Sequence, residues 1–323
     1  MRGLSRREFF GGAAGLGAVA ALSSSTITRA AVTSRASRAI AARGARTARS
    51  AQDVGPLAGA IVNLGSYPGS GTYLNTANIF DGFVGLPLAT TFQKVYMGHG
   101  SFPSTPSTKV TQLAAAGCQF LISIEPNRDM TTNEQKRIRA WLAMLNNAGI
   151  SYRVSLYSEC NNKAFATADE WLTYWNYYAP VVQDAGVVCA YEPGCGFPAL
   201  PRAVAYFPTS PVPSELWLDY YATAFRAGGR IDQLISMAQT AGISTGIGEW
   251  GWSAGPSVFT PMVMPWWNEY CAYLISLAQQ GKLAYGGMYF GSVSNGREAD
   301  VIGSASDPRV PGIQNVSNAL AAG

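Results

Sequence analysis

The chain has 323 residues and a formal net charge of +4, with 23 basic and 19 acidic side chains. Only 13% of its residues are charged and 48% are apolar, which excludes intrinsic disorder over most of its length. Nine of the arginines and two of the acidic residues fall within residues 1–53. Subtracting these leaves 14 basic and 17 acidic side chains, a net charge of −3, and argues against a nucleic-acid partner for the rest of the chain.

The N-terminus carries the pattern of an export signal. Arg6 and Arg7 precede a short apolar run over residues 11–22. A basic segment before such a run is typical of a secretory signal, and the run is shorter than the about 20 residues that cross a bilayer. The paired arginines resemble a twin-arginine (Tat) signal, which the export machinery reads as an address. An ordinary secretory signal or a basic tail is the alternative.

Residues 29–53 are rich in Ala, Arg and Ser, a composition typical of a disordered stalk. We therefore divide the chain into a leader and stalk over residues 1–53 and one folded catalytic domain over residues 54–323. The expected protein is secreted and monomeric, has the Tat machinery as its export partner and carries no stable membrane anchor.

The cysteines and the histidine limit the possible chemistry. There are five cysteines, whose spacings match no zinc pattern, and a single histidine, His99. Catalytic triads and His-based metal sites elsewhere in the chain are therefore excluded. Acid–base chemistry has to rest on carboxylates, and we expect neither a metal nor a cofactor.

From residue 58 onward, a short apolar run, a loop and a helical stretch alternate eight times. The expected strands are residues 60–64, 94–97, 120–124, 153–157, 187–191, 216–220, 244–248 and 284–289. Eight such units in about 265 residues predict an α/β fold with a single (β/α)8 barrel, whose usual size is about 250 residues. The rival, a doubly wound sheet, needs a glycine-rich phosphate turn that residues 64–71 do not match.

Two helices between these runs have clear starts. Thr131 with Glu134, and Thr167 with Glu170, have the spacing of capping boxes. After the second, aromatic residues repeat at helical spacing, and we expect them to be core rather than a ligand platform. They are Trp171, Tyr174, Trp175 and Tyr178.

Four glutamates stand at the carboxyl ends of expected strands, where barrel enzymes carry their chemistry. They are Glu125, Glu159, Glu192 and Glu249. Glycoside hydrolysis needs two carboxylates, about 5–5.5 Å apart in a retaining enzyme. Strands four and seven face each other across a barrel mouth, so Glu159 and Glu249 are the pair best placed for this reaction.

The segments around this pair resemble the clan A (4/7) glycoside hydrolases, nearest to glycoside hydrolase family 26, the β-mannanase-type barrels. Residues 153–162 (RVSLYSECNN) resemble that family's strand-four segment, and residues 243–251 (ISTGIGEWG) resemble its strand-seven segment. The resemblance implies that Glu159 is the acid/base and Glu249 the nucleophile. It also implies double displacement on β-linked glycans of mannan or glucan type.

Residues 215–221 (ELWLDYY) resemble the sixth strand of this family, which assigns substrate-site roles to Asp219 and Tyr221. The family's Tyr hydrogen-bonds the nucleophile. Two departures indicate a divergent relative. Ser158 stands where the family has His before the acid/base, and we expect its hydroxyl to bind a sugar hydroxyl instead. Tyr289 or its neighbour Phe290 stands where the family has a Trp platform in strand eight, and we expect Tyr289 to bind substrate there.

Further substrate-binding residues are expected on the same rim: Trp252 as a sugar platform, with His99, Asn161 and Glu192. Each of the last three has a plain alternative. Asn161 could hold the loop of Glu159, and His99 could be an ordinary loop residue. Glu192 and Glu125 could pair with Arg128 or Lys163.

Cys160 and Cys195 follow neighbouring strands, so we expect a disulfide between their loops. The sequence as a whole predicts an exported retaining glycoside hydrolase with a polysaccharide or oligosaccharide substrate. The alternatives are a non-catalytic glycan-binding barrel at the cell surface and a structural cell-surface protein attached through the stalk.

Overall fold

The computed structural model describes residues 85, 92–195, 200–222, 230–252, 263–285 and 305–322. The predicted leader and stalk, the first expected strand and Tyr289 lie outside the described residues, so those predictions stay untested. Within the described ranges, none of the helices is long and apolar enough to cross a membrane.

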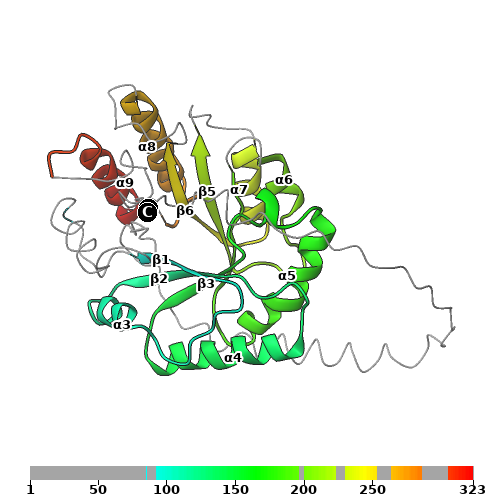
Figure 1. Cartoon of the computed structure of the whole chain (residues 1–323). Helices are drawn as coiled ribbons and strands as arrows, with labels where there is room; N and C mark the ends of the chain where they lie inside the picture. Colours follow the sequence, from blue (N-terminus) through cyan, green and yellow to red (C-terminus); the bar gives the residue numbers. More distant parts are fainter. Residues whose placement is uncertain are drawn as a thin grey trace, which may run out of the picture. The chain divides into compact units, whose positions relative to one another are not determined.

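The described strands form one parallel sheet whose spatial order follows the chain. They are β1 (Phe92–Met97), β2 (Gln119–Ile124), β3 (Tyr152–Leu156), β4 (Cys189–Tyr191), β5 (Glu215–Ala222) and β6 (Ser244–Trp252). These are the expected strands two to seven. A parallel bridge between Gly246 and Tyr285 joins β6 to the start of the expected eighth strand. The sheet curls and helices lie outside it (Figure 1), as in a (β/α)8 barrel, which confirms the predicted fold.

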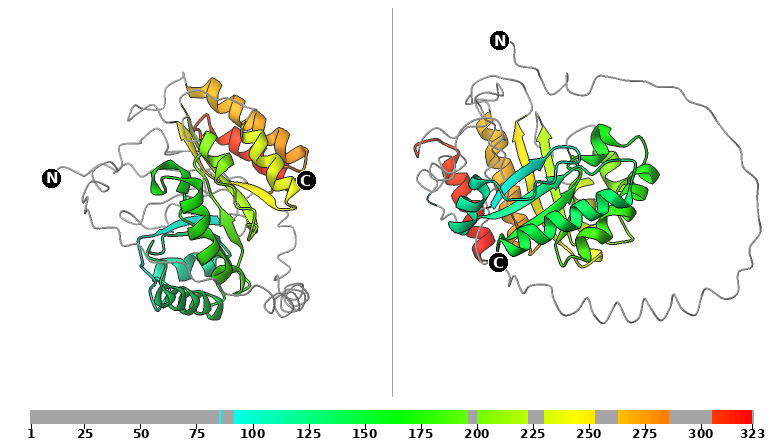
Figure 2. Two further views of the ribbon diagram at one scale, coloured as in Figure 1. Left: turned by 90° about the vertical axis from the view of Figure 1, so that its right-hand side faces the viewer. Right: turned by 60° about the horizontal axis from the view of Figure 1, so that its bottom comes forward.

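Helices follow the strands in the expected alternation. They are α3 (Thr108–Ala115), α4 (Thr132–Asn147), α5 (Ala168–Gln183), α6 (Leu200–Ala205), α7 (Arg230–Thr240), α8 (Val263–Gln279) and α9 (Val310–Ala322). A short π-helix, Cys160–Ala164, stands between β3 and α5. The two views of Figure 2 show α8 and α9 packed side by side and α4 and α5 covering the outer face of the sheet.

The predicted helix starts are confirmed, but only half of each capping box forms. The hydroxyls of Thr131 and Thr167 accept hydrogen bonds from the backbone N–H groups of Glu134 and Glu170, at 3.3 and 3.2 Å. The glutamates do not return the bond to the cap residue. Glu134 is buried and accepts from the backbone N–H of Asn127, so it ties α4 to the loop that precedes it.

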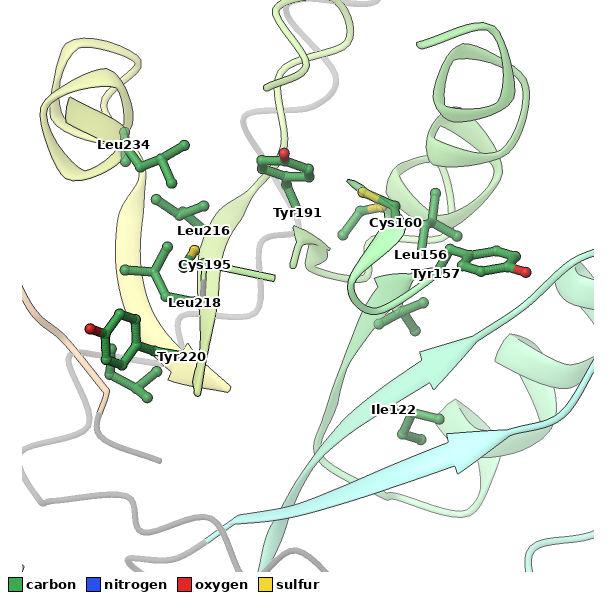
Figure 3. Close-up of a cluster of buried hydrophobic side chains, with 14 of the residues drawn as sticks. Ile122, Leu156, Tyr157, Cys160, Tyr191, Cys195, Leu216, Leu218, Tyr220 and Leu234 are labelled. Atoms are coloured by element: carbon green, nitrogen blue, oxygen red, sulfur yellow. The ribbon is translucent and has the colours of Figure 1, made fainter. Parts of the chain in front are cut away.

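The apolar core lies between the sheet and the helices. On β5, Leu216, Leu218 and Tyr220 belong to this core together with Leu234 of α7 (Figure 3). The predicted aromatic stripe of α5 is fully buried in the same core, which confirms that it is not a ligand platform.

The inside of the barrel has its own apolar layer. Trp217 of β5 stacks on Tyr285 with ring centroids 5.1 Å apart and packs with Leu121 and Ala190. Glycine is required at position 246, because a Cβ there would lie 2.8 Å from the Trp217 ring. A second group lies toward the amino-terminal strand ends. Arg153 donates to Glu215 at 2.9 Å, to Gln119 at 2.9 Å and to the Tyr285 hydroxyl at 2.9 Å.

Candidate active site

The glutamates predicted at strand ends lie at the carboxyl end of the sheet. Glu125 directly follows β2, Glu192 directly follows β4, and Glu159 lies three residues beyond the end of β3. Glu249 lies in the second half of β6. The side chains of Tyr221, Glu249 and Trp252 are outside the described part of the structure, so their predicted roles rest on the sequence.

Glu159 stands in an unusual backbone conformation. Its φ is 55°, and that of Tyr157 is 53°, in the left-handed region that non-glycine residues rarely adopt. The π-helix begins at the next residue, Cys160. Strained backbone and π-helical turns are both concentrated at functional sites, because only surrounding contacts can hold them. The conformation therefore marks the loop of Glu159 as a candidate site on structural grounds alone.

Several contacts hold this loop in place. The backbone N–H of Glu159 donates to the carbonyl of Glu192 at 2.8 Å, which joins the loop to the end of β4. Asn161 is fully buried, and its side chain bonds both the N–H and the carbonyl of Gly194 at 2.8 Å each. Gly194 lies close to the Glu159 carboxylate, since a Cβ at position 194 would be 3.4 Å from Glu159 Oε1.

Asn161 therefore takes the second of its two expected roles, holding the loop of the proposed acid. Its burial leaves no surface for a sugar hydroxyl, so the prediction of substrate contact is not supported.

A buried lysine lies beneath the loop. Lys94 of β1 has no exposed surface, and its Nζ lies 2.6 Å from Glu192 Oε1 and 3.1 Å from Asp219 Oδ2. The same Nζ donates to Ser158 Oγ at 3.2 Å, and Ser158 Oγ donates to Asp219 Oδ2 at 2.9 Å. Strands β1 and β5 and the loops that follow β3 and β4 thus meet in one hydrogen-bonded ionic group.

Sequence reasoning missed Lys94, although one signal was present. A lysine within an apolar run that forms a strand covered on both faces has to find a buried counter-charge.

Asp219 and Glu192 are fully buried, so neither presents the accessible surface that the predicted sugar contacts require. Burial, followed by the nearby Glu192 carboxylate, raises the pKa of Asp219 well above its usual value, while Lys94 acts in the opposite direction. The backbone of Asp219 is fixed as well, because its carbonyl accepts from Cys195 N–H at 2.6 Å and its N–H donates to Pro193 O at 3.1 Å. These two carboxyls form the floor of the site.

An irregularity in β6 sets the position of Glu249. Leu218 of β5 is the register partner of Ile247, whereas the next residue, Asp219, is the partner of Glu249. Gly248 is the extra residue, so β6 carries a bulge at this point. Bulges beside active sites redirect the residue that follows them. Here the bulge gives Glu249 the register position opposite the floor residue Asp219.

The exposed part of the rim holds a second polar group. His99 Nε2, after β1, lies 3.4 Å from Glu125 Oε2, and the His99 ring lies 6.0 Å from that of Tyr157. Arg128 lies over the Tyr157 ring and 3.8 Å from Glu170. Glu125 thus contacts His99, and Glu192 contacts Lys94. The side chain of Lys163, one of the expected partners, lies outside the described part of the structure. His99 remains exposed enough to contact a ligand.

The predicted disulfide between Cys160 and Cys195 is wrong for this structure, in which both are free and buried. The two loops follow neighbouring strands, but each cysteine side chain packs in the apolar core drawn in Figure 3. Cys195 Sγ lies 3.4 Å from the carbonyl of Pro193, and burial raises the pKa of both thiols well above the usual value.

The fold is that of a (β/α)8 barrel, and its strand-end glutamates lie at the end where such barrels carry their chemistry. It is similar to the catalytic domain of a family 26 endo-β-1,4-mannanase from Bacillus sp. JAMB-750, with a TM-score of 0.55 and 14% identity over 82% of this chain and 87% of the other. It is also similar to a modular endo-β-1,4-mannanase from Cellulomonas fimi, with a TM-score of 0.54 and 13% identity over 79% and 70%.

A third similar structure is an endo-1,4-β-mannanase from Rhizomucor miehei, with a TM-score of 0.53 and 10% identity over 82% of this chain and 96% of the other. At these identities the likeness is one of fold, and it agrees with the divergent family 26 resemblance of the sequence. No protein-family model and no curated protein matches the chain.

Proposed function

We propose that the chain is a retaining glycoside hydrolase that cleaves β-linked glycans of mannan or glucan type. One observation carries the proposal: Glu159 lies in the loop after β3 and Glu249 in the second half of β6, at the end of the parallel sheet where such barrels carry their chemistry. The strained, firmly held loop of Glu159 and the bulge before Glu249 support the same pair. The names of the similar structures supply the substrate class.

The mechanism is a double displacement. Glu159 donates its proton to the glycosidic oxygen while the carboxylate of Glu249 attacks the anomeric carbon, which breaks the bond to the leaving group and forms a glycosyl-enzyme. Glu159, now ionised, then removes a proton from water, which attacks the same carbon and releases Glu249. Two inversions retain the anomeric configuration. No metal or cofactor takes part in these steps.

Two substitutions test these roles on a panel of β-mannan, glucomannan, mixed-linkage β-glucan and xylan. Glu249→Gln removes the nucleophile and should lower kcat by about 10³-fold or more on every active substrate. Glu159→Gln should do the same on polymers but retain part of the first step on aryl glycosides, whose leaving groups need no proton. Glu269→Gln is the matched control, because Glu269 is an exposed residue of α8.

Proton NMR of the first product distinguishes the mechanisms, because a retaining enzyme releases the β-anomer first. Undiminished activity in Glu249→Gln, or initial release of the α-anomer, would refute the assignment. Glycan binding without turnover in the unmodified protein would instead establish the alternative, a non-catalytic glycan-binding barrel.

We also propose that the protein is exported as a monomer through the Tat machinery. The paired arginines and the apolar run after them support this proposal. Changing Arg6 and Arg7 together to Lys should retain the protein in the cell, and equal secretion of the two forms would contradict it.

A further inference from the structure

Burial of the Lys94 ammonium group is unfavourable in free energy unless nearby groups compensate for the lost water. The Lys94 side chain has no exposed surface, and removing an ammonium group from water costs several kcal/mol unless counter-charges are close. Glu192 and Asp219 supply those counter-charges. Proteins in which buried charges of this kind are replaced by well-packed apolar residues of similar size are often just as stable. Stability therefore gives no sufficient reason for a lysine here.

Each partner of Lys94 is next to, bonded to or paired in the sheet with a proposed catalytic residue. Ser158 is the residue before Glu159, and it accepts a hydrogen bond from Lys94 Nζ at 3.2 Å. Glu192 binds Lys94 through its carboxylate, and its backbone carbonyl accepts from the N–H of Glu159. Asp219 is the register partner of Glu249. Lys94 therefore connects the loop of the proposed acid to the strand pair of the proposed nucleophile.

The charges of the group explain why an ammonium is needed at this position. Glu192 and Asp219 both approach Gly248 so closely that a Cβ there would collide with an oxygen of each. Two carboxyls at such a distance repel one another when both are ionised. Lys94 faces both of them, with the Tyr96 ring 4.9 Å from its Nζ, and Glu159 acts on Asp219 from the loop side.

We infer that Lys94 is a positioning residue of the proposed hydrolase. Its ammonium joins Ser158, Glu192 and Asp219 into one rigid floor, and this floor fixes the loop of Glu159 relative to Glu249. The inference rests on the proposed function, and it gives Ser158, which stands where the family has His, a contact with Lys94 beside the acid/base. Lys94 itself is buried and touches no substrate.

The test is Lys94→Met, which keeps the length of the side chain and removes the charge. Because a displacement of about 1 Å costs about 100-fold in rate, kcat should fall by at least that factor while KM changes less than about threefold. Loss of a positive charge favours the protonated form of nearby carboxyls, so the pH profile of kcat/KM should also move to higher pH. Lys94→Arg should recover part of kcat.

Two further variants keep the test decisive if Lys94→Met does not fold. Lys94→Met combined with Glu192→Gln removes the lysine together with its nearest carboxylate, at 2.6 Å, and it should fold and keep the loss of kcat. Ser158→Ala removes only the hydroxyl between Lys94 and the loop. It should displace the loop less than the lysine variant does, so kcat should fall only about tenfold. Lys136→Met, at an exposed position of α4, is the matched control.

Hydrogen exchange of residues 158–162 supplies a readout that does not depend on catalysis. Lys94→Met should speed exchange in this segment, and Lys136→Met should not. A folded Lys94→Met protein with the kcat, pH profile and exchange rates of the unmodified chain would overturn the inference. If the unmodified chain hydrolyses none of the glycans, the proposed function fails, and the exchange data alone decide whether Lys94 holds the loop.

Discussion

Asp219 of β5 and Glu249 of β6 lie opposite each other only because Gly248 is an extra residue in β6. Without it, the regular register from Leu218 and Ile247 would pair Asp219 with residue 248. The bulge therefore brings a candidate nucleophile to the strand position across from the floor of the site. Its glycine also makes room for the floor, since both buried carboxyls occupy the space that a Cβ at position 248 would need.

Gly248→Ala should destabilise the protein and lower its activity. The added Cβ would lie 2.5 Å from Asp219 Oδ1 and even closer to Glu192 Oε1, and neither carboxyl can move without disturbing Lys94. We expect a loss of about 2 kcal/mol in the free energy of unfolding, the middle of the range for overpacking. Urea denaturation measures it. Gly98→Ala is the control, since a Cβ there would meet no atom within 4 Å. Equal stability of the two variants would contradict this account of the floor.

The raised pKa of Asp219 predicts a specific dependence of stability on pH. The folded state keeps the Asp219 proton at pH values where the unfolded chain has lost it. The contribution of Asp219 to the free energy of unfolding is therefore fully present below its pKa in the unfolded chain, about 4. It decreases as the pH rises toward the pKa of Asp219 in the folded protein.

Asp219→Asn removes the titrating group at nearly constant shape. The difference in unfolding free energy between the unmodified protein and this variant should thus shrink, or reverse in sign, from pH 4 to pH 8. Urea denaturation across that range gives the difference, and a constant value would show that Asp219 does not titrate differently on unfolding.

Asn161→Ala should loosen the loop of Glu159. The substitution leaves the buried N–H and carbonyl of Gly194 without the two bonds of 2.8 Å that Asn161 makes. An unsatisfied buried group costs about 1–3 kcal/mol, so we expect a loss of about 3 kcal/mol in the free energy of unfolding. Asn147→Ala, at the exposed end of α4, should cost less than about 0.5 kcal/mol. A loss in Asn161→Ala no larger than in this control would exclude the loop-holding role.

The five cysteines should behave as buried thiols. All five are free and buried in the structure, and burial raises the pKa of Cys271 to about 12. Since the thiolate is the reactive form, the folded protein should react slowly with a thiol reagent at pH 8. Five equivalents should react in urea without reductant. Reaction of only three equivalents would show that two cysteines form a disulfide, as the sequence predicted for Cys160 and Cys195.

The sequence was informative wherever local patterns determine the outcome. The alternation of apolar runs and helices predicts strands β1–β6 in order, and Thr131 and Thr167 predict the helix starts. The placement of glutamates after strands follows from the same alternation. Such patterns report what each segment forms, but not which distant side chains meet.

The floor of the site could not be predicted for this reason. Lys94 and Asp219 are 125 residues apart, and only the closure of the sheet brings their side chains to 3.1 Å. The burial of Asp219 and Glu192 depends on that closure, and the register of Glu249 depends on a one-residue bulge that no spacing in the sequence reveals. The missing disulfide has a similar cause, because nearby loops do not determine which way the two thiols turn.

The stacked rings of Trp217 and Tyr285 separate two groups of buried charge in the described part of the barrel. The Arg153–Glu215 pair lies at the amino-terminal strand ends, and Lys94 with its two carboxyls lies toward the carboxyl ends. Both rings are bonded to the Arg153–Glu215 pair, because Trp217 Nε1 donates to Glu215 Oε2 at 2.8 Å and the Tyr285 hydroxyl accepts from Arg153 at 2.9 Å. A substitution of Arg153 or Glu215 should therefore disturb the apolar layer beneath the floor of the site as well as remove a charge.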